Sequence, residues 1–147
     1  MRTLKDLCLA LIRFAETFSW LPPLLARLSV GYVFLESGWG KINGIVKVIE
    51  FFTTLNLPAP AFQAYLVAYT ELIAGGLLIV GLVTRLASIP LIITMVVALI
   101  TAKSADFNEF SDLLAASEYL NILLLLYLVI KGPGRLALDS LVQKNLV

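Results

Sequence analysis

Four long apolar stretches divide the chain. They cover about residues 23–42, 62–82, 86–103 and 114–131, and each approaches or reaches the roughly 20 residues that a helix needs to cross a bilayer. Segments such as ELIAGGLLIVGL and NILLLLYLVI are continuously apolar, without the period-two alternation that is typical of membrane strands. The pattern therefore predicts an all-α fold, an integral membrane four-helix bundle.

Two shorter segments are amphipathic. In residues 3–18 the leucine and phenylalanine side chains share one helical face, and Arg13 and Glu16 lie on the other. In the connection after the first span, residues 45–55 place apolar side chains opposite Lys47 and Glu50. We expect two short interfacial helices, one at the N-terminus and one in the first outer loop, where it either rests among lipid headgroups or caps the bundle.

Composition and charge agree with a membrane protein. Hydrophobic residues make up 60% of the 147 positions, charged residues make up 14%, and the mean hydropathy is +0.95. Residues 1–147 are expected to form a single transmembrane domain. Lysine and arginine are concentrated on the side that holds both termini, which predicts a multi-pass protein with both termini in the cytoplasm. The short turn GLVTRLA predicts an antiparallel hairpin of the second and third spans.

Residue usage excludes several kinds of site. The chain has no histidine and one cysteine, Cys8, which rules out histidine-ligated haem, a histidine-bound metal, a Ser-His-Asp triad and a dithiol couple. We expect no metal and no covalently bound cofactor, so any redox role must borrow its electron carrier. The net charge of +1, without a basic run, gives no support for nucleic-acid binding.

Ionisable side chains inside the apolar stretches are the candidate chemistry. With a rise of 1.5 Å per residue, Glu36 and Glu71 both lie roughly 10–13 Å below the outer surface. A charge at the bilayer centre costs from about 2.5 to above 10 kcal/mol, so such groups normally face protein or a wet cavity. We predict one network of Glu36, Lys41 and Glu71 as catalytic candidates, with Glu118 and Asn121 of the fourth helix as substrate-binding candidates. Either Lys41 neutralises one carboxylate or one carboxyl keeps its proton.

The helical wheel leaves alternatives open for several side chains. Lys41 and Glu36 lie on nearly opposite faces of the first helix, so both faces must meet protein, although the long Lys41 side chain can still curl toward Glu36. Arg27 and Arg85 are interpreted either as interfacial anchors or as substrate-binding residues. Trp39 belongs either to an aromatic belt or to a site where its ring stacks on a quinone. Glu71 shares its face with small residues that let a neighbouring backbone approach closely, Ala64, Ala68 and Gly75.

The network also has a purely structural interpretation. Buried polar groups of this kind can act as a clamp that fixes the register of the helices without any chemistry. Intramembrane acids are nevertheless functional sites by default, which favours the catalytic interpretation of Glu36 and Glu71.

Three segments resemble the DoxX family of small four-helix membrane proteins: RLSVGYVFLESGWGKI in the first helix, TELIAGGLLIVGLVTRLASIP across the hairpin, and GPGRLALD after the fourth helix. The similarity runs over roughly residues 24–139. The resemblance implies a membrane fold, with links to quinone-dependent redox complexes and thiol homeostasis in some relatives and with chaperone or cargo-receptor roles in distant eukaryotic ones. The positions that match the family pattern are Arg27, Gly38, Lys41, Glu71 and Arg85.

Two hypotheses of function follow. The first is a bacterial inner-membrane protein that supports electron transfer from a small reduced sulfur compound, or another outer-side donor, to the quinone pool with the help of a partner redox protein. Glu36 and Glu71 would exchange protons, and Lys41 would polarise a quinone carbonyl. The alternative is a non-enzymatic assembly or binding subunit for a partner protein. A proton-coupled transporter is less favoured, because four short helices leave little room for alternating access unless the chain forms a homo-oligomer.

Overall fold

The fold is all-helical over the residues that the computed structural model describes, which are 9, 13–14, 16–102, 110–134 and 137–139. The helices in chain order are α2 (Leu21–Asn43), α3 (Ile45–Thr54), α4 (Pro60–Val80), α5 (Thr84–Thr101), α6 (Phe110–Ala115) and α7 (Ser117–Lys131). The all-α prediction is therefore confirmed for this part of the chain.

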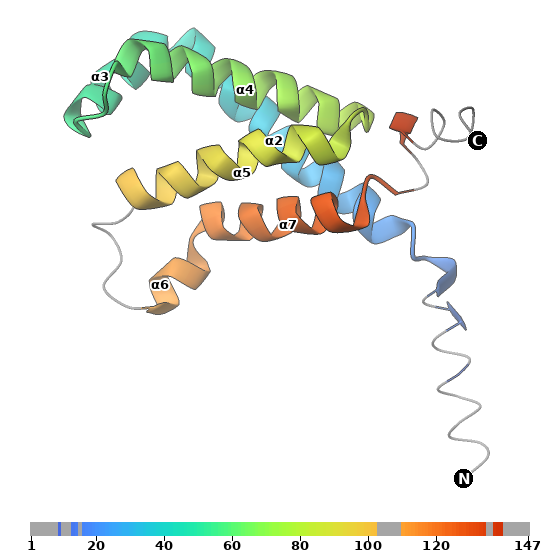
Figure 1. Ribbon diagram of the computed structural model, residues 1–147. Helices are drawn as coiled ribbons and strands as arrows, with labels where there is room; N and C mark the ends of the chain where they lie inside the picture. The colour runs from blue at the N-terminus through green and yellow to red at the C-terminus, as the bar shows by residue number, and fades with distance from the viewer. Residues whose placement is uncertain (1–8, 10–12, 15, 103–109, 135–136, 140–147) are drawn as a thin grey trace.

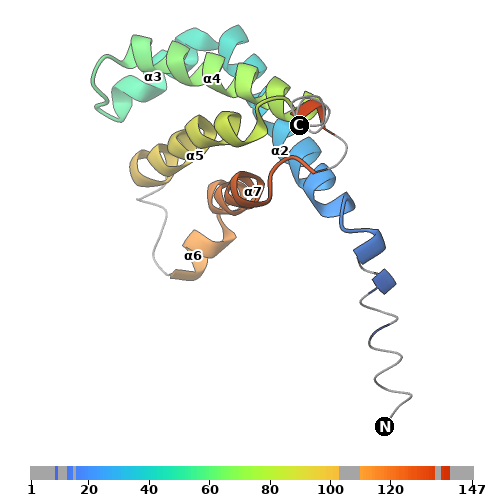
Figure 2. The same cartoon turned by 45° about the vertical axis from the view of Figure 1, so that its right-hand side comes forward.

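The four longest helices run alternately in opposite directions. Figure 1 shows α5 and α7 side by side, with α2 behind them and alongside α4, and Figure 2 shows the same neighbours after rotation. We call one end of the bundle the α3 end, where α3 and α6 lie, and the other the turn end, where residues 81–83 join α4 to α5. The predicted antiparallel hairpin is thus formed by α4 and α5.

Three of the four predicted spans coincide with single helices, and the fourth is divided into two. The first three stretches coincide with α2, α4 and α5 within two residues at each end. The fourth is divided, because Ala116 adopts an extended backbone (φ −65°, ψ 132°) between α6 and α7. Among the described helices, α4 and α5 are long and apolar enough to cross a membrane, whereas α2 carries three charged residues and α7 has 15 residues.

Of the two predicted interfacial helices, the structure describes the second. α3 forms as expected at residues 45–54, and it packs against α4. This packing agrees with the capping alternative for that segment. The predicted N-terminal helix at residues 3–18, together with Cys8, lies largely outside the described residues.

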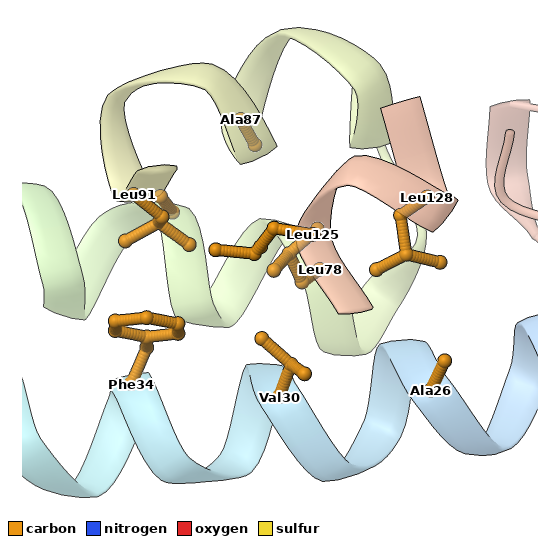
Figure 3. Close-up of a cluster of buried hydrophobic side chains, with 9 residues drawn as sticks. Ala26, Val30, Phe34, Leu78, Ala87, Leu91, Leu125 and Leu128 are labelled. Atoms are coloured by element: carbon orange, nitrogen blue, oxygen red, sulfur yellow. The ribbon is translucent and has the colours of Figure 1, made fainter. Parts of the chain in front are cut away.

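The hydrophobic core joins all four long helices. Figure 3 shows side chains of α2 directed toward those of α4, α5 and α7. The members that are almost fully buried are Val30, Phe34, Leu78, Leu91, Leu125 and Leu128. Interdigitated side chains of this kind fix the relative positions of the helices. The core therefore also fixes where the polar side chains at the α3 end can meet.

Helices α2 and α4 are in backbone contact. A Cβ atom added at Gly38 would lie 2.5 Å from the backbone nitrogen of Leu72 and 2.9 Å from the carbonyl oxygen of Ala68. One added at Gly75 would lie 2.6 Å from the backbone nitrogen of Leu35. Small residues at membrane-helix contacts permit this approach. The contact sets the register of α2 against α4, and with it the level of every polar side chain on both helices.

The turn end is closed by a segment that follows α7. The carboxylate of Asp139 accepts hydrogen bonds from the backbone N–H groups of Val83 (2.6 Å) and Thr84 (2.9 Å), and its own N–H donates to the carbonyl of Gly81 (3.0 Å). The first N–H groups of a helix have no partner within the helix, and an acidic side chain there also meets the positive end of the helix dipole. Asp139 therefore caps α5 from a distant part of the sequence.

Candidate functional site

The α3 end of the bundle contains a cavity of about 920 Å³. Side chains from α2, α3, α4, α5 and α7 line it, and most of them are apolar. The aromatic and methionine members of the wall are Phe34, Phe51, Phe52, Phe62 and Met95. The ionisable members are Lys41, Lys47, Glu71 and Glu118. The cavity is thus an apolar chamber with a few charged groups in its wall.

The charged centre of the cavity is an ion pair between α2 and α4. The ammonium of Lys41 pairs with Oε2 of Glu71 and also donates a hydrogen bond to Oγ of Ser37 at 2.7 Å. Glu71 is 1% exposed, whereas the side chain of Lys41 is 27% exposed. Ser37 precedes Lys41 by one helical turn, so the two side chains share a face of α2. The predicted meeting of Lys41 with Glu71 is confirmed.

Burial makes this pair costly to break. Removing one partner of a buried ion pair is typically destabilising by about 3–5 kcal/mol, because the other charge is left without compensation. Replacing both partners by apolar groups is often neutral or stabilising. An apolar pair would therefore serve stability equally well. Stability alone therefore does not explain the two charges at the cavity wall.

Two of the candidates from the fourth helix also face the cavity. Glu118 and Asn121 of α7 line it, as do Thr94 of α5 and Gln63 of α4. Within the described residues Glu118 accepts a hydrogen bond from the hydroxyl of Ser117 at 3.1 Å, and no direct bond joins it to Lys41 or Glu71. These groups surround a shared space, so a bound molecule could contact several of them at once.

The expectation that Glu36 belongs to the same network is wrong. Glu36 is exposed and is not part of the cavity wall. It lies about 140° around the helix from Lys41. Because Gly38 and Lys41 face α4, this rotation directs Glu36 away from the bundle. The ammonium of Lys41 reaches Glu71 on α4 and does not curl back toward Glu36.

Arg27, Arg85 and Trp39 also lie outside the cavity. Arg27 is 3% exposed at the turn end, where its Nη1 donates to the carbonyl of Pro133 at 3.2 Å. Arg85 is exposed at the same end, and Trp39 is 61% exposed on α2. The geometry of Arg27 supports a structural role, because it links α2 to the segment that caps α5.

Sequence reasoning missed several polar members of the site. Ser37 could have been found from its spacing of four residues before Lys41. Thr94 and Gln63 carry no such signal, because isolated polar residues in apolar helices commonly bond to their own backbone: the hydroxyl of Thr94 donates to the carbonyl of Leu91 at 2.8 Å. Within the described residues no cluster of three metal-ligating side chains occurs.

Comparison with known proteins gives a consistent picture. A family model described as DoxX matches residues 23–104. A putative oxidoreductase of Bacillus subtilis, CatD, is 36% identical over 123 residues, which cover 83% of this chain and 87% of the relative. An uncharacterized membrane protein of Mycobacterium tuberculosis is 35% identical over 137 residues, covering 84% of each chain. The inner membrane protein YqjF of Escherichia coli is 30% identical over 125 residues, covering 83% of this chain and 92% of the relative. No solved structure matches the chain.

Proposed function

We propose, from the premise that this chain belongs to the DoxX family of membrane proteins, that it binds a quinone in the cavity and supports quinone reduction as a subunit of an inner-membrane redox complex. The observation that supports this most directly is the Lys41–Glu71 pair, which gives a charged end to a large apolar chamber. The Bacillus subtilis relative is named a putative oxidoreductase, and the Escherichia coli relative an inner membrane protein.

The cavity suits a flat head group with an apolar tail. Small-molecule sites are typically about 300–1,000 Å³, mostly apolar, with a few placed polar groups, and a volume of about 920 Å³ falls in this range. An ammonium group has three N–H donors. Within the described residues Lys41 uses two of them, on Ser37 and Glu71. The third is available for an acceptor such as a quinone carbonyl, while Phe51 and Phe52 of α3 contact the apolar part.

The residues of the chain would supply binding and protons. A quinone, when bound, accepts two electrons and two protons to give a quinol. Glu71 is placed to exchange a proton at its carboxyl group, and Lys41 to stabilise negative charge on the carbonyl oxygen. The chain has no histidine and one cysteine. We therefore assign the electrons to a reduced donor, of which a small sulfur compound is our leading candidate, and their delivery to a partner redox protein.

A binding experiment tests the site. Purified protein in lipid nanodiscs is titrated with decylubiquinone and with a short-chain menaquinone, and the dissociation constant is measured by calorimetry. Loss of one hydrogen bond to a charged group costs about 1.5–3 kcal/mol, so Lys41→Met should weaken binding roughly 10- to 150-fold. Glu50→Gln changes an exposed carboxylate of α3 outside the cavity wall and serves as the matched control. Val67→Trp should fill the cavity and block binding while the ion pair stays in place.

A turnover experiment tests the proton role separately. Protein reconstituted with its redox partner should lose quinone reduction in Glu71→Gln and keep it in Glu50→Gln. Unchanged turnover in Glu71→Gln would remove the proton role, and absence of saturable quinone binding by the wild type would remove the whole proposal. If Glu36→Gln lost turnover while Glu71→Gln stayed active, the proton role would belong to Glu36 on the exposed face of α2 and the proposal for Glu71 would be wrong.

A further inference from the structure

The face of α2 that points away from α4 carries an exposed carboxylate at an unexpected depth. Leu35 contacts Gly75 of α4, and Gly38 contacts Leu72. Glu36 therefore lies level with the middle of α4, within about 8 Å of its midpoint along the axis. α4 is long and apolar enough to cross a membrane. At this level the surroundings of an exposed side chain are either lipid or another protein.

We call this surface the Glu36 face, and it consists of Ser29, Tyr32, Glu36, Trp39 and Gly40, none of which lines the cavity. All five residues are exposed. Tyr32 and Trp39 are each 61% exposed on either side of the carboxylate, and tyrosine and tryptophan are enriched where proteins meet. A Cβ atom at Gly40 would have no neighbour within 4 Å, unlike one at Gly38, so packing inside the chain does not explain this glycine. An open glycine on a membrane helix allows a second helix to approach closely.

The carboxylate has no counter-charge within the described part of the chain. Glu36 forms no ion pair or hydrogen bond there. The basic residues of α2 are on the opposite side: Lys41 pairs with Glu71, and Arg27 is buried at the turn end. Charged groups within a membrane usually meet a partner of opposite charge. The Glu36 face is therefore electrostatically incomplete in the isolated chain.

The described residues of a second copy offer no basic side chain that could complete it. The exposed basic side chains of the described residues lie near the ends of the bundle: Arg13, Lys47, Arg85 and Lys131. Two copies in one membrane have the same orientation, so their α2 helices would run parallel. Packed through this face, they would bring the two Glu36 carboxylates to the same level. Like charges at one level repel, so charge complementarity favours a different protein.

We propose that the Glu36 face is the docking surface for a transmembrane helix of a partner protein that carries a lysine or arginine level with Glu36. The basic side chain would donate charge-assisted hydrogen bonds to the carboxylate, and the two aromatic rings would cover them from lipid. This role corresponds to the assembly function expected as the alternative from the sequence. It is independent of the quinone proposal, because Glu36 lies outside the cavity.

Site-specific crosslinking in native membranes tests the proposal. A photoreactive amino acid is placed at Ser29 of the full-length protein, two helical turns before Glu36 and outside the cavity wall, and the crosslinked peptides are sequenced by mass spectrometry. We expect one partner segment, apolar and containing a lysine or arginine. Glu36→Gln should lower the adduct yield roughly tenfold, as expected for loss of a charge-assisted hydrogen bond, whereas Glu50→Gln leaves it unchanged. The same probe at Ile73, exposed on α4, should not yield this partner.

A charge exchange completes the test. Glu36→Lys should abolish the adduct. The adduct should return when Glu36→Lys is combined with a partner whose basic residue is replaced by glutamate. Adducts between two copies of this chain, adducts with lipid alone, or a yield that Glu36→Gln does not change would each overturn the proposal. Quinone binding by Glu36→Gln is measured in parallel, so that failure of the docking proposal and failure of the quinone proposal give different results.

Discussion

Replacing Gly38 by alanine tests whether α2 and α4 are held in backbone contact. The added Cβ atom would lie 2.5 Å from the backbone nitrogen of Leu72, whereas ordinary van der Waals contact begins at 3.4 Å. Because the neighbour is backbone, a side-chain rotation cannot relieve the clash. The two helices must separate by close to an ångström, or α2 must shift along α4.

The size of the effect follows from this overpacking. Extra methyl groups in a well-packed interior typically cost about 1–3 kcal/mol. For a protein of this size a loss of 1 kcal/mol lowers the melting temperature by roughly 2–4 °C, so Gly38→Ala should melt about 2–12 °C lower than the wild type. The quinone affinity that we propose should fall too, because Leu72 is adjacent to Glu71 and Gly38 is one turn from Lys41.

Thermal unfolding in nanodiscs, followed by circular dichroism, provides the assay. Gly40→Ala is the matched control, since a Cβ atom there meets nothing within 4 Å. Alanine favours a helix over glycine by up to about 1 kcal/mol, so this variant should melt at or above the wild-type temperature. Wild-type melting of Gly38→Ala, or a larger loss in Gly40→Ala, would refute the close contact between the helices.

Three further changes give separate tests of the pair, the cap and the core. Lys41→Met should cost about 3–5 kcal/mol, and adding Glu71→Leu should recover most of that loss; equal melting of the single and double variants would show that Glu71 does not depend on Lys41. Asp139→Ala removes the acceptor for two N–H groups of α5 and should cost about 0.5–2 kcal/mol, with faster amide exchange at residues 83–84; unchanged exchange would argue against the cap. Phe34→Ala should cost about 3–5 kcal/mol in the same unfolding assay, and a loss below 1 kcal/mol would mean that Phe34 is not part of the core.

The helices were predictable because long apolar runs and proline breaks are local signals. α2, α4 and α5 begin and end within two residues of the predicted spans. The division at Ala116 was not predictable in the same way, because no proline or glycine marks it within an otherwise apolar segment. The capping role of Asp139 was also missed, since the helix that it caps begins 55 positions earlier in the sequence.

The candidate site was predictable in part, for a physical reason. The depth estimate put Glu36 and Glu71 at one level with Lys41 above them, and of the predicted network only the Lys41–Glu71 contact forms within the described residues. The small residues beside Glu71 correctly indicated close helix packing. Depth alone cannot show on which side of a helix a neighbour lies. The helical wheel directs Glu36 away from Lys41, whereas the cost of a charge in lipid favours burial of its carboxylate. The structure shows that the rotation was the better guide.

The break at Ala116 leaves α7 with 15 residues, a length of about 22 Å, against a hydrocarbon thickness of about 30 Å. α7 lies beside α5, which has 18 residues. For α7 to span a bilayer of this thickness, the bilayer around this pair would have to thin locally, or its headgroups would have to descend toward the start of α7. Glu118 and Asn121 are at that start. In such a bilayer the shortened helix would bring the aqueous boundary to the rim of the cavity that we propose to bind a quinone, and protons would have a shorter route to Glu71 than along a full-length span.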